Sequence, residues 1–233
     1  MTRHELKEQL QHDQFTDAVS RVITYTTENK ERVTVVAIVI AAVLAVAGGL
    51  WWYFSYQRSI RQHELQSVFT VLDAQVGPSN ELAKTFPTEQ AKTQASMKAL
   101  SDLVAKYPGT RQGLIAQYYL GTLKAQQGDT KGAEADLAKV ADSSDDCSSL
   151  AKIALAQLYM GQGRSTEAQK LLQSIVEKPT DLVSKGQAQI LLTRLQETSN
   201  PKAAKALLQS LKSPSQPAAI ARAASELEAQ LSQ

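Results

Sequence analysis

Residues 120–137 read LGTLKAQQGDTKGAEADL, and residues 155–172 repeat the same pattern as LAQLYMGQGRSTEAQKLL. Both stretches hold a leucine, a small residue, a central glycine, an alanine and a second leucine at matching places. Residues 190–207, ILLTRLQETSNPKAAKAL, follow at the same spacing of 35 residues, with Thr198 in the place of the glycine. A fixed period of this length is the sequence signature of a protein built from stacked repeats.

Each repeat predicts two helices joined by a tight turn. The expected helices cover residues 111–127 and 130–141, then 149–162 and 165–177, then 185–197 and a last one that begins at Pro201. Gly128 and Gly163 follow the first helices of their units, where glycine suits a left-handed backbone. We expect Thr130 and Ser165 to cap the second helices. Pro201 suits the first helical position, because its missing N–H is harmless there.

The second helix of each unit carries an alanine and, four residues later, a leucine on the same face. The alanines are Ala133, Ala168 and Ala203, and the leucines are Leu137, Leu172 and Leu207. Where two helices cross closely only a small side chain fits, and the leucine fills the remaining space. This spacing resembles the tetratricopeptide pattern. A single hairpin would leave its apolar face in water, so we expect an all-α fold with the hairpins stacked in an α-solenoid over residues 111–233.

Further helical segments flank the three units. Residues 57–76 and 93–107 carry apolar residues at helical spacing and predict a leading helical pair within residues 55–110. Near the C-terminus, Ile220, Ala224, Leu227 and Leu231 form one apolar stripe. Repeat arrays need a terminal helix with a polar outer face, so this stripe predicts a capping helix.

An uncharged apolar stretch precedes the repeats. Residues 33–54 read VTVVAIVIAAVLAVAGGLWWYF. As a helix this stretch would span about 33 Å at 1.5 Å per residue, and a bilayer hydrocarbon core is about 30 Å thick. Trp51, Trp52 and Tyr53 gather at its C-terminal end, and such rings favour the lipid–water interface. The stretch predicts a single transmembrane helix after an N-terminal segment of residues 1–32.

The basic residues near the span are Arg21, Lys30 and Arg32 before it and Arg58 and Arg61 after it. This bias predicts a cytoplasmic N-terminus and a repeat domain on the outer side of the membrane, which would be the periplasm in a diderm bacterium. A cleaved signal peptide is the alternative, because residues 45–47 (AVA) fit a small-residue cleavage pattern.

A stripe of small residues runs along the predicted span. Ala37, Ala41, Ala45 and Gly49 recur every four residues. Such stripes let a second membrane helix approach closely. Chance recurrence in an alanine-rich segment explains the stripe equally well, so a partner helix is a hypothesis.

A partial Leu6-Lys7 and Asp13-Gln14-Phe15 element precedes the span, and Tyr107-Pro108-Gly109-Thr110 opens the repeat domain after it. This layout resembles the ancillary subunits of the bacterial SecYEG translocon (YfgM-like), which carry a tetratricopeptide repeat-like domain. The resemblance implies a periplasmic scaffold for protein–protein interaction, with translocon subunits and periplasmic chaperones as partners. A repeat protein that coordinates cell-envelope assembly or cell division is the alternative function.

The repeat register predicts a binding groove on the concave face, lined by the first helix of each unit. The expected groove residues are Ile115, Tyr118, Thr122, Gln157, Met160, Lys185 and Leu192. Tyrosine and methionine are frequent at protein interfaces. The alternative places Tyr118 and Met160 in the core between helices.

Composition argues against several other functions. With 25 basic and 23 acidic residues and no basic block, nucleic-acid binding is not expected. The three histidines are scattered outside the repeats, so we expect no metal site. Cys147 is the single cysteine, and Asp145 and Asp146 beside it would discourage a thiolate, which predicts a passive surface thiol. We therefore expect no enzyme, no cofactor and no small-molecule substrate.

Overall fold

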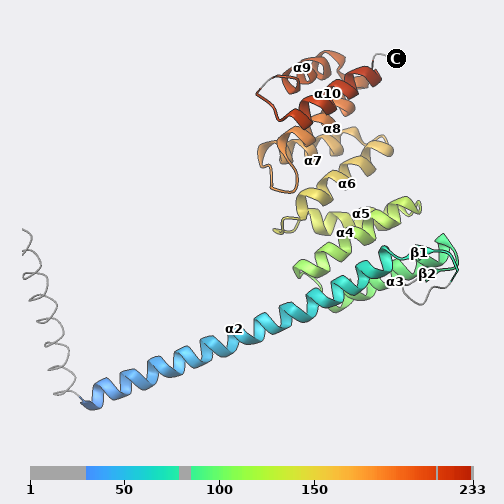
Figure 1. The fold of residues 1–233 in the computed structure, drawn as a ribbon. Helices are drawn as coiled ribbons and strands as arrows, with labels where there is room; N and C mark the ends of the chain where they lie inside the picture. Colours follow the sequence, from blue (N-terminus) through green and yellow to red (C-terminus); the bar gives the residue numbers. More distant parts are fainter. Residues whose placement is uncertain (1–29, 79–84, 214, 232–233) are drawn as a thin grey trace, which may run out of the picture. The chain divides into compact units, whose positions relative to one another are not determined.

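The structure is a computed structural model that describes residues 30–78, 85–213 and 215–231 (Figure 1). The chain divides into two units, Met1–Ile60 and Arg61–Gln233. The predicted cytoplasmic segment, with Leu6-Lys7 and Asp13-Gln14-Phe15, lies outside the described residues except for its last residues, 30–32.

Helix α2 covers Lys30–Leu72 without interruption. The sequence predicted a membrane helix over residues 33–54 and a separate helix from residue 57, but both belong to this one helix. No proline occurs between Lys30 and Leu72, and residues 55–72 contain no glycine either, so nothing in this stretch ends the helix.

Eight further helices follow among the described residues, and the all-α fold class is confirmed. They are α3 (Glu89–Lys106), α4 (Arg111–Gln126), α5 (Thr130–Ala141), α6 (Ser148–Gly161), α7 (Ser165–Glu177), α8 (Lys185–Ser199), α9 (Pro201–Leu211) and α10 (Ala218–Leu231). Helices α4 and α5, α6 and α7, and α8 and α9 pack as hairpins, while α5 on α6 and α7 on α8 join one hairpin to the next. Figure 1 shows this succession of stacked helices from α3 to α10.

Two short strands lie in the connection between α2 and α3. β1 (Gln75–Val76) and β2 (Thr85–Phe86) pair in parallel, and the Gly77 N–H donates to the Phe86 carbonyl at 3.0 Å. The pairing brings the two ends of this connection together, ahead of α3.

The turns of the first two hairpins use glycine as predicted. Gly128 has φ +80° and Gly163 has φ +73°, a backbone conformation that side chains with a Cβ rarely adopt. The capping prediction was wrong by one residue, since Thr130 and Ser165 are already the first residues of their helices. Asp129 caps α5, because its carboxylate accepts the Gly132 N–H at 2.9 Å.

The alanine and leucine positions of the first two units form the cores of their hairpins. Ala133 and Ala168 are fully buried, and Leu137 and Leu172 are at most 1% exposed. A Cβ added to Gly121 of α4 would lie 2.8 Å from Leu137 Cγ, which is closer than real contacts allow. The small residue there permits the close crossing of α4 and α5.

The third hairpin departs from the fixed spacing. Ala204 and Leu208 are its buried pair, whereas Ala203 and Leu207 are only half-buried. The second helix is therefore displaced by one residue from the predicted register.

Two local features cause this displacement. Residues 178–184 form a longer connection, and its Val183 is 1% exposed and packs against Ile175 and Ala188. In the following turn Asn200 is the only residue between α8 and α9, and its side chain accepts the Ala203 N–H at 3.2 Å. The connection is one residue longer than residues 142–147, and the turn is two residues shorter than residues 127–129 and 162–164, so no single period fits the third hairpin.

A helix also packs at each end of the array of three hairpins. Leu65 and Val68 of α2 share an apolar cluster with Leu100 and Leu103 of α3. At the other end, α10 packs on α8 and α9 and buries Ala224 and Leu227, while its other face is exposed and carries Arg222 and Glu226. These are the positions predicted for the leading pair and for the capping helix.

Candidate functional site

The first helices of the repeats carry the predicted groove residues with different exposure. Gln157 of α6 and Lys185, the first residue of α8, are exposed. Thr122 of α4 is half-buried and donates its hydroxyl to the Tyr119 carbonyl at 2.8 Å. These three side chains are accessible to a partner.

The apolar members of the predicted groove lie deeper. Ile115 and Tyr118 are half-buried and pack against the clusters on either side of α4. Met160 packs against the cluster of Ala168 and Leu172, as the core alternative described. Leu192 is 6% exposed and belongs to the same core, because the longer connection before α8 shifts the register.

The repeat of 35 residues indicates two groove residues that the sequence analysis left out. Leu150 and Ile153 of α6 are the counterparts of Ile115 and Tyr118 of α4, just as Gln157 is the counterpart of Thr122. Both side chains are half-buried. We call the surface formed by these counterparts and by Tyr119 the α4–α6 face: Ile115, Tyr118, Tyr119, Thr122, Leu150, Ile153 and Gln157.

Two tyrosines of the α4–α6 face form an aromatic cluster with Phe69 of α2. Tyr119 is 38% exposed, and its ring meets Phe69 of α2 edge to face at 5.2 Å between centroids. The Tyr118 ring meets the Tyr119 ring, also edge to face, at 5.3 Å between centroids. Rings held in this geometry are rigid, so an exposed tyrosine among them offers contact area at a low cost in conformational entropy.

The hairpin of α4 and α5 is held together by buried polar groups. The Asp136 carboxylate is 8% exposed, accepts the Gln117 amide at 3.1 Å and accepts the Lys124 ammonium at 2.6 Å. A buried charge needs such partners, because burying it alone would cost several kcal/mol, to an order of magnitude. The network holds α4 in a fixed orientation against α5.

A second network joins neighbouring hairpins. Arg164, at the turn before α7, donates to both carboxylate oxygens of Glu134 on α5, at 3.0 and 2.9 Å. The Tyr159 hydroxyl donates to Glu134 as well, and the Arg164 guanidinium lies 3.9 Å from the centre of the Tyr159 ring. Burial and the Glu134 carboxylate raise the pKa of Tyr159, which stays a neutral donor. The network ties α5, α6 and the turn before α7 to one another.

Cys147 corrects a prediction, because it is buried rather than at the surface. It is 5% exposed and packs with Leu137, Val140 and Ala151. Burial, together with a hydrogen bond to Asp145, raises the pKa of the Cys147 thiol to about 12. Such a thiol stays protonated at neutral pH and is a poor nucleophile.

The N-terminal part of α2 exposes its apolar side chains along its whole length. Exposed fractions run from 52% to 74% for the large side chains between Val35 and Tyr56, with Trp51 the most exposed. By length and composition the helix could cross a membrane, as an anchor or as a signal sequence. Ala41, Ala45 and Gly49 of the predicted stripe are exposed, and the side chain of Ala37 lies outside the described residues.

No group of three His, Cys, Asp or Glu that could hold a metal ion occurs in residues 30–78, 85–213 and 215–231. The shifted pKa values in the same ranges belong to the ion-pair networks, to half-buried tyrosines and to Cys147. What the arrangement offers is a partly apolar surface on a rigid helical scaffold.

A family model described as a tetratricopeptide repeat-like domain matches residues 27–181, which is more than half of the chain. Among solved structures, the chain is similar to nearly identical TPR-like repeats of Podosopora anserina, from a protein named for the kinesin light chain. The identity is 20%, the TM-score is 0.46, and the similarity covers 62% of this chain and 87% of that one. No curated protein matches significantly. From the family match and from its stacked helical hairpins, we conclude that the chain belongs to the tetratricopeptide repeat-like family.

Proposed function

We propose that the chain is a membrane-anchored scaffold that binds other proteins through the α4–α6 face. The observation that carries the proposal is the continuous apolar surface of α2 from Val35 to Phe54, which packs against nothing within the described residues. Apolar surface of this extent in water would cost about 25 cal/mol per Å², so it calls for lipid around it. Tetratricopeptide repeat-like domains typically act by binding proteins rather than by catalysis, which agrees with the partly apolar face of α4 and α6.

The aromatic side chains support a particular depth in the membrane. Trp51, Trp52, Tyr53, Phe54 and Tyr56 are all exposed, and successive helical residues lie about 100° apart, so the rings surround α2. We place the outer interface of a bacterial inner membrane at this ring of residues, with the N-terminus in the cytoplasm and the repeats in the periplasm. The intact mass of the protein purified from membranes tests retention of the anchor, since a chain that begins after Ala47 would contradict it.

For the partner, we propose the protein translocon, to which the scaffold would link periplasmic chaperones. The support is the layout of a partial lead element, a single span and a repeat domain that opens with Tyr107-Pro108-Gly109-Thr110. An anchored domain meets partners in the same membrane at a high effective concentration, so weak contacts suffice.

Crosslinking in native membranes, followed by purification of the full chain and mass spectrometry, tests this choice of partner. We expect translocon subunits and chaperones among the crosslinked proteins. Cell-wall, division or outer-membrane assembly proteins in their place would favour the envelope role instead.

Matched variants connect the partner to the α4–α6 face. Tyr119→Ala and Gln157→Ala remove exposed side chains from that face, while Gln209→Ala removes an exposed side chain from α9. We expect the first two to reduce the crosslinked partners and the third to leave them unchanged. Equal amounts of crosslinked partners with all three variants would show that the partners do not bind through the α4–α6 face.

A further inference from the structure

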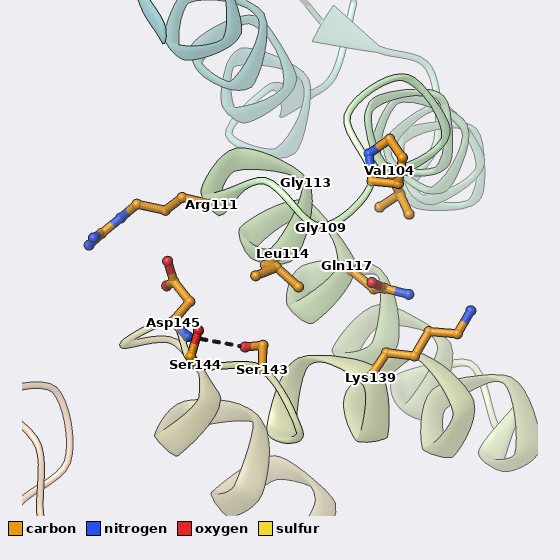
Figure 2. Close-up of a pocket in the computed structure, with 11 residues that line it drawn as sticks. Val104, Gly109, Arg111, Gly113, Leu114, Gln117, Lys139, Ser143, Ser144 and Asp145 are labelled. Carbon is orange, nitrogen blue, oxygen red and sulfur yellow. Dashed lines mark hydrogen bonds between the residues drawn. The ribbon is translucent and has the colours of Figure 1, made fainter. Parts of the chain in front are cut away.

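A hollow between the turn that precedes α4 and the connection from α5 to α6 has a volume of about 600 Å³ (Figure 2). Its two basic side chains, Lys139 and Arg111, lie on opposite sides of it and point away from it. One bound group cannot meet both charges, so the charges do not define a site there.

Another hollow, which we call the C-terminal hollow, lies between α9 and α10, beside the end of α8. Its volume is about 750 Å³. Ala204 and Leu208 of α9, which are 3% and 4% exposed, form its apolar floor. Its α10 side carries the small residues Ser225 and Ala229. Figure 1 shows the three helices together at the C-terminal end of the array.

The position of α10 explains why the C-terminal hollow is open. A Cβ added to Gly186 of α8 would lie 2.9 Å from the Ile220 side chain, so the start of α10 lies close against α8. Helix α6 packs mainly on α5 and α8 mainly on α7, whereas α10 divides its packing between α8 and α9. Helix α9 is therefore covered less completely than α5 and α7, and the hollow opens along it.

Two charged side chains at the C-terminal hollow have no ion-pair partner in residues 30–78, 85–213 and 215–231. Glu197 of α8 is half-buried and Lys205 of α9 is exposed. The third charged residue there, Glu228, is already engaged, because it accepts the Lys212 ammonium at 2.6 Å. The hollow therefore presents one acid and one base that can each bind an opposite charge.

The first hairpin shows what meets the equivalent of Lys205 elsewhere in the array. Ala204 is the buried counterpart of Ala133, so Lys205 corresponds to the next residue of α5, Glu134. Glu134 pairs with Arg164 of the following hairpin at 2.9 Å. Within the described residues no such pair forms at Lys205, so an acidic group from another molecule would complete the contact.

The chain itself carries the complementary charges. In a contact between two copies related by a two-fold axis, residue i of each copy meets residue j of the other. Because Glu197 and Lys205 border the same hollow, such an axis places the acid of each copy opposite the base of the other. The small side chains of Ser225 and Ala229 allow a helix of the second copy to approach closely. The arrangement closes at two copies and forms no filament.

We infer that the C-terminal hollow is where two copies of this chain associate, with Glu197 of each copy paired with Lys205 of the other. The ion pairs are partly exposed, and such pairs contribute little each, so the dimer is weak and sensitive to salt. The contact does not depend on the α4–α6 face or on the membrane anchor. Copies anchored in one membrane would meet at a higher effective concentration.

The test is the monomer–dimer equilibrium of the full chain, measured by sedimentation equilibrium in a density-matched detergent. Lys205→Glu leaves only acids free at the hollow, and Glu197→Lys leaves only bases, so each variant repels its own copies. We expect each substitution to raise the Kd of the dimer about tenfold or more. Lys131→Glu, which changes an exposed lysine of α5, is the matched control and should leave the Kd unchanged.

Mixing the two charge variants separates this pairing from a loss of folding. A Lys205→Glu chain offers acids to the bases of a Glu197→Lys chain, so the mixture should form a heterodimer with a Kd near that of the parent. Native mass spectrometry with one variant isotope-labelled distinguishes the heterodimer from homodimers. A parent that stays monomeric, a dimer that neither variant weakens, or a mixture without heterodimer would each overturn the inference.

Discussion

The Arg164 guanidinium lies 2.9 Å from the Glu134 carboxylate and joins the second hairpin to the first across the repeat boundary. Because Tyr159 also bonds Glu134, the removal of Arg164 leaves a partly buried carboxylate with one partner fewer. We expect Arg164→Ala to lower Tm, and we expect Glu134→Gln added to it to lower Tm little further, since both remove one interaction. Thermal unfolding followed by circular dichroism measures this, and two independent, additive losses would contradict the coupling.

The ion pair of Glu64 with Lys106 predicts a dependence of stability on pH. The hydrogen bond from Lys106 is the main cause that holds the pKa of Glu64 below its usual value, with a second one from Tyr107. A carboxyl with a depressed folded pKa adds stability above its unfolded pKa, about 4.3, and this is lost as pH falls through the folded value. Lys106→Met should therefore lose less stability than the parent between about pH 5 and pH 3.

Lys98→Met is the matched control for that experiment, because among residues 30–78, 85–213 and 215–231 Lys98 pairs only with the exposed Asp102 on its own helix. Urea unfolding at a series of pH values gives the comparison. Parallel curves for the parent and Lys106→Met would rule out a contribution from the pair.

The close crossing of α4 and α5 at Gly121 predicts that added volume there is destabilising. A Cβ at Gly121 would press on the Leu137 side chain, so Gly121→Ala should cost about 1–3 kcal/mol of unfolding free energy. Gly161→Ala adds the same methyl group at the end of α6 and meets no atom within 4 Å. The control should be neutral or slightly stabilising in urea unfolding, and equal effects of the two substitutions would contradict the packing described for Gly121.

The displaced register of the third hairpin can be measured with two neighbouring leucines. Leu208 is 4% exposed in the core, so Leu208→Ala should cost about 2–5 kcal/mol. Leu207→Ala should cost clearly less, because that side chain is half-buried. A larger loss of unfolding free energy for Leu207→Ala would contradict the displaced register and would support the fixed spacing of 35 residues.

The buried Cys147 thiol should react with a thiol reagent only when the first two hairpins open. With its pKa raised to about 12, the thiol is protonated at pH 8, and its burial blocks access as well. Labelling should be slow in buffer and complete in urea. Fast labelling of the native chain would place the thiol at the surface after all.

Local sequence signals predicted most of the first two hairpins. The second helices start and end where expected, at Thr130–Ala141 and Ser165–Glu177, because glycine turns precede them. The third hairpin could not be predicted from a single period, since the shift depends on Val183 filling a gap between helices that only the folded array creates. The same shift buries Leu192, which the fixed register had assigned to the groove.

The predicted groove stays a prediction, but the structure shows how accessible its residues are. Gln157 and Thr122 are accessible, and the same period would have added Leu150 and Ile153 had it been applied to each groove position. The burial of Cys147 was missed because its neighbours in sequence are polar, whereas its neighbours in space are Val140 and Ala151.

The single-residue turn at Asn200 has a consequence for recombination between units. The first two hairpins have turns of equal length with glycine in the same conformation, so a segment cut at equivalent points of the turns could be exchanged between them. The third hairpin is excluded from such exchange, because its longer connection, with the buried Val183, and its shorter turn must change together. A chimera that carries one without the other would bring the wrong faces of α8 and α9 together.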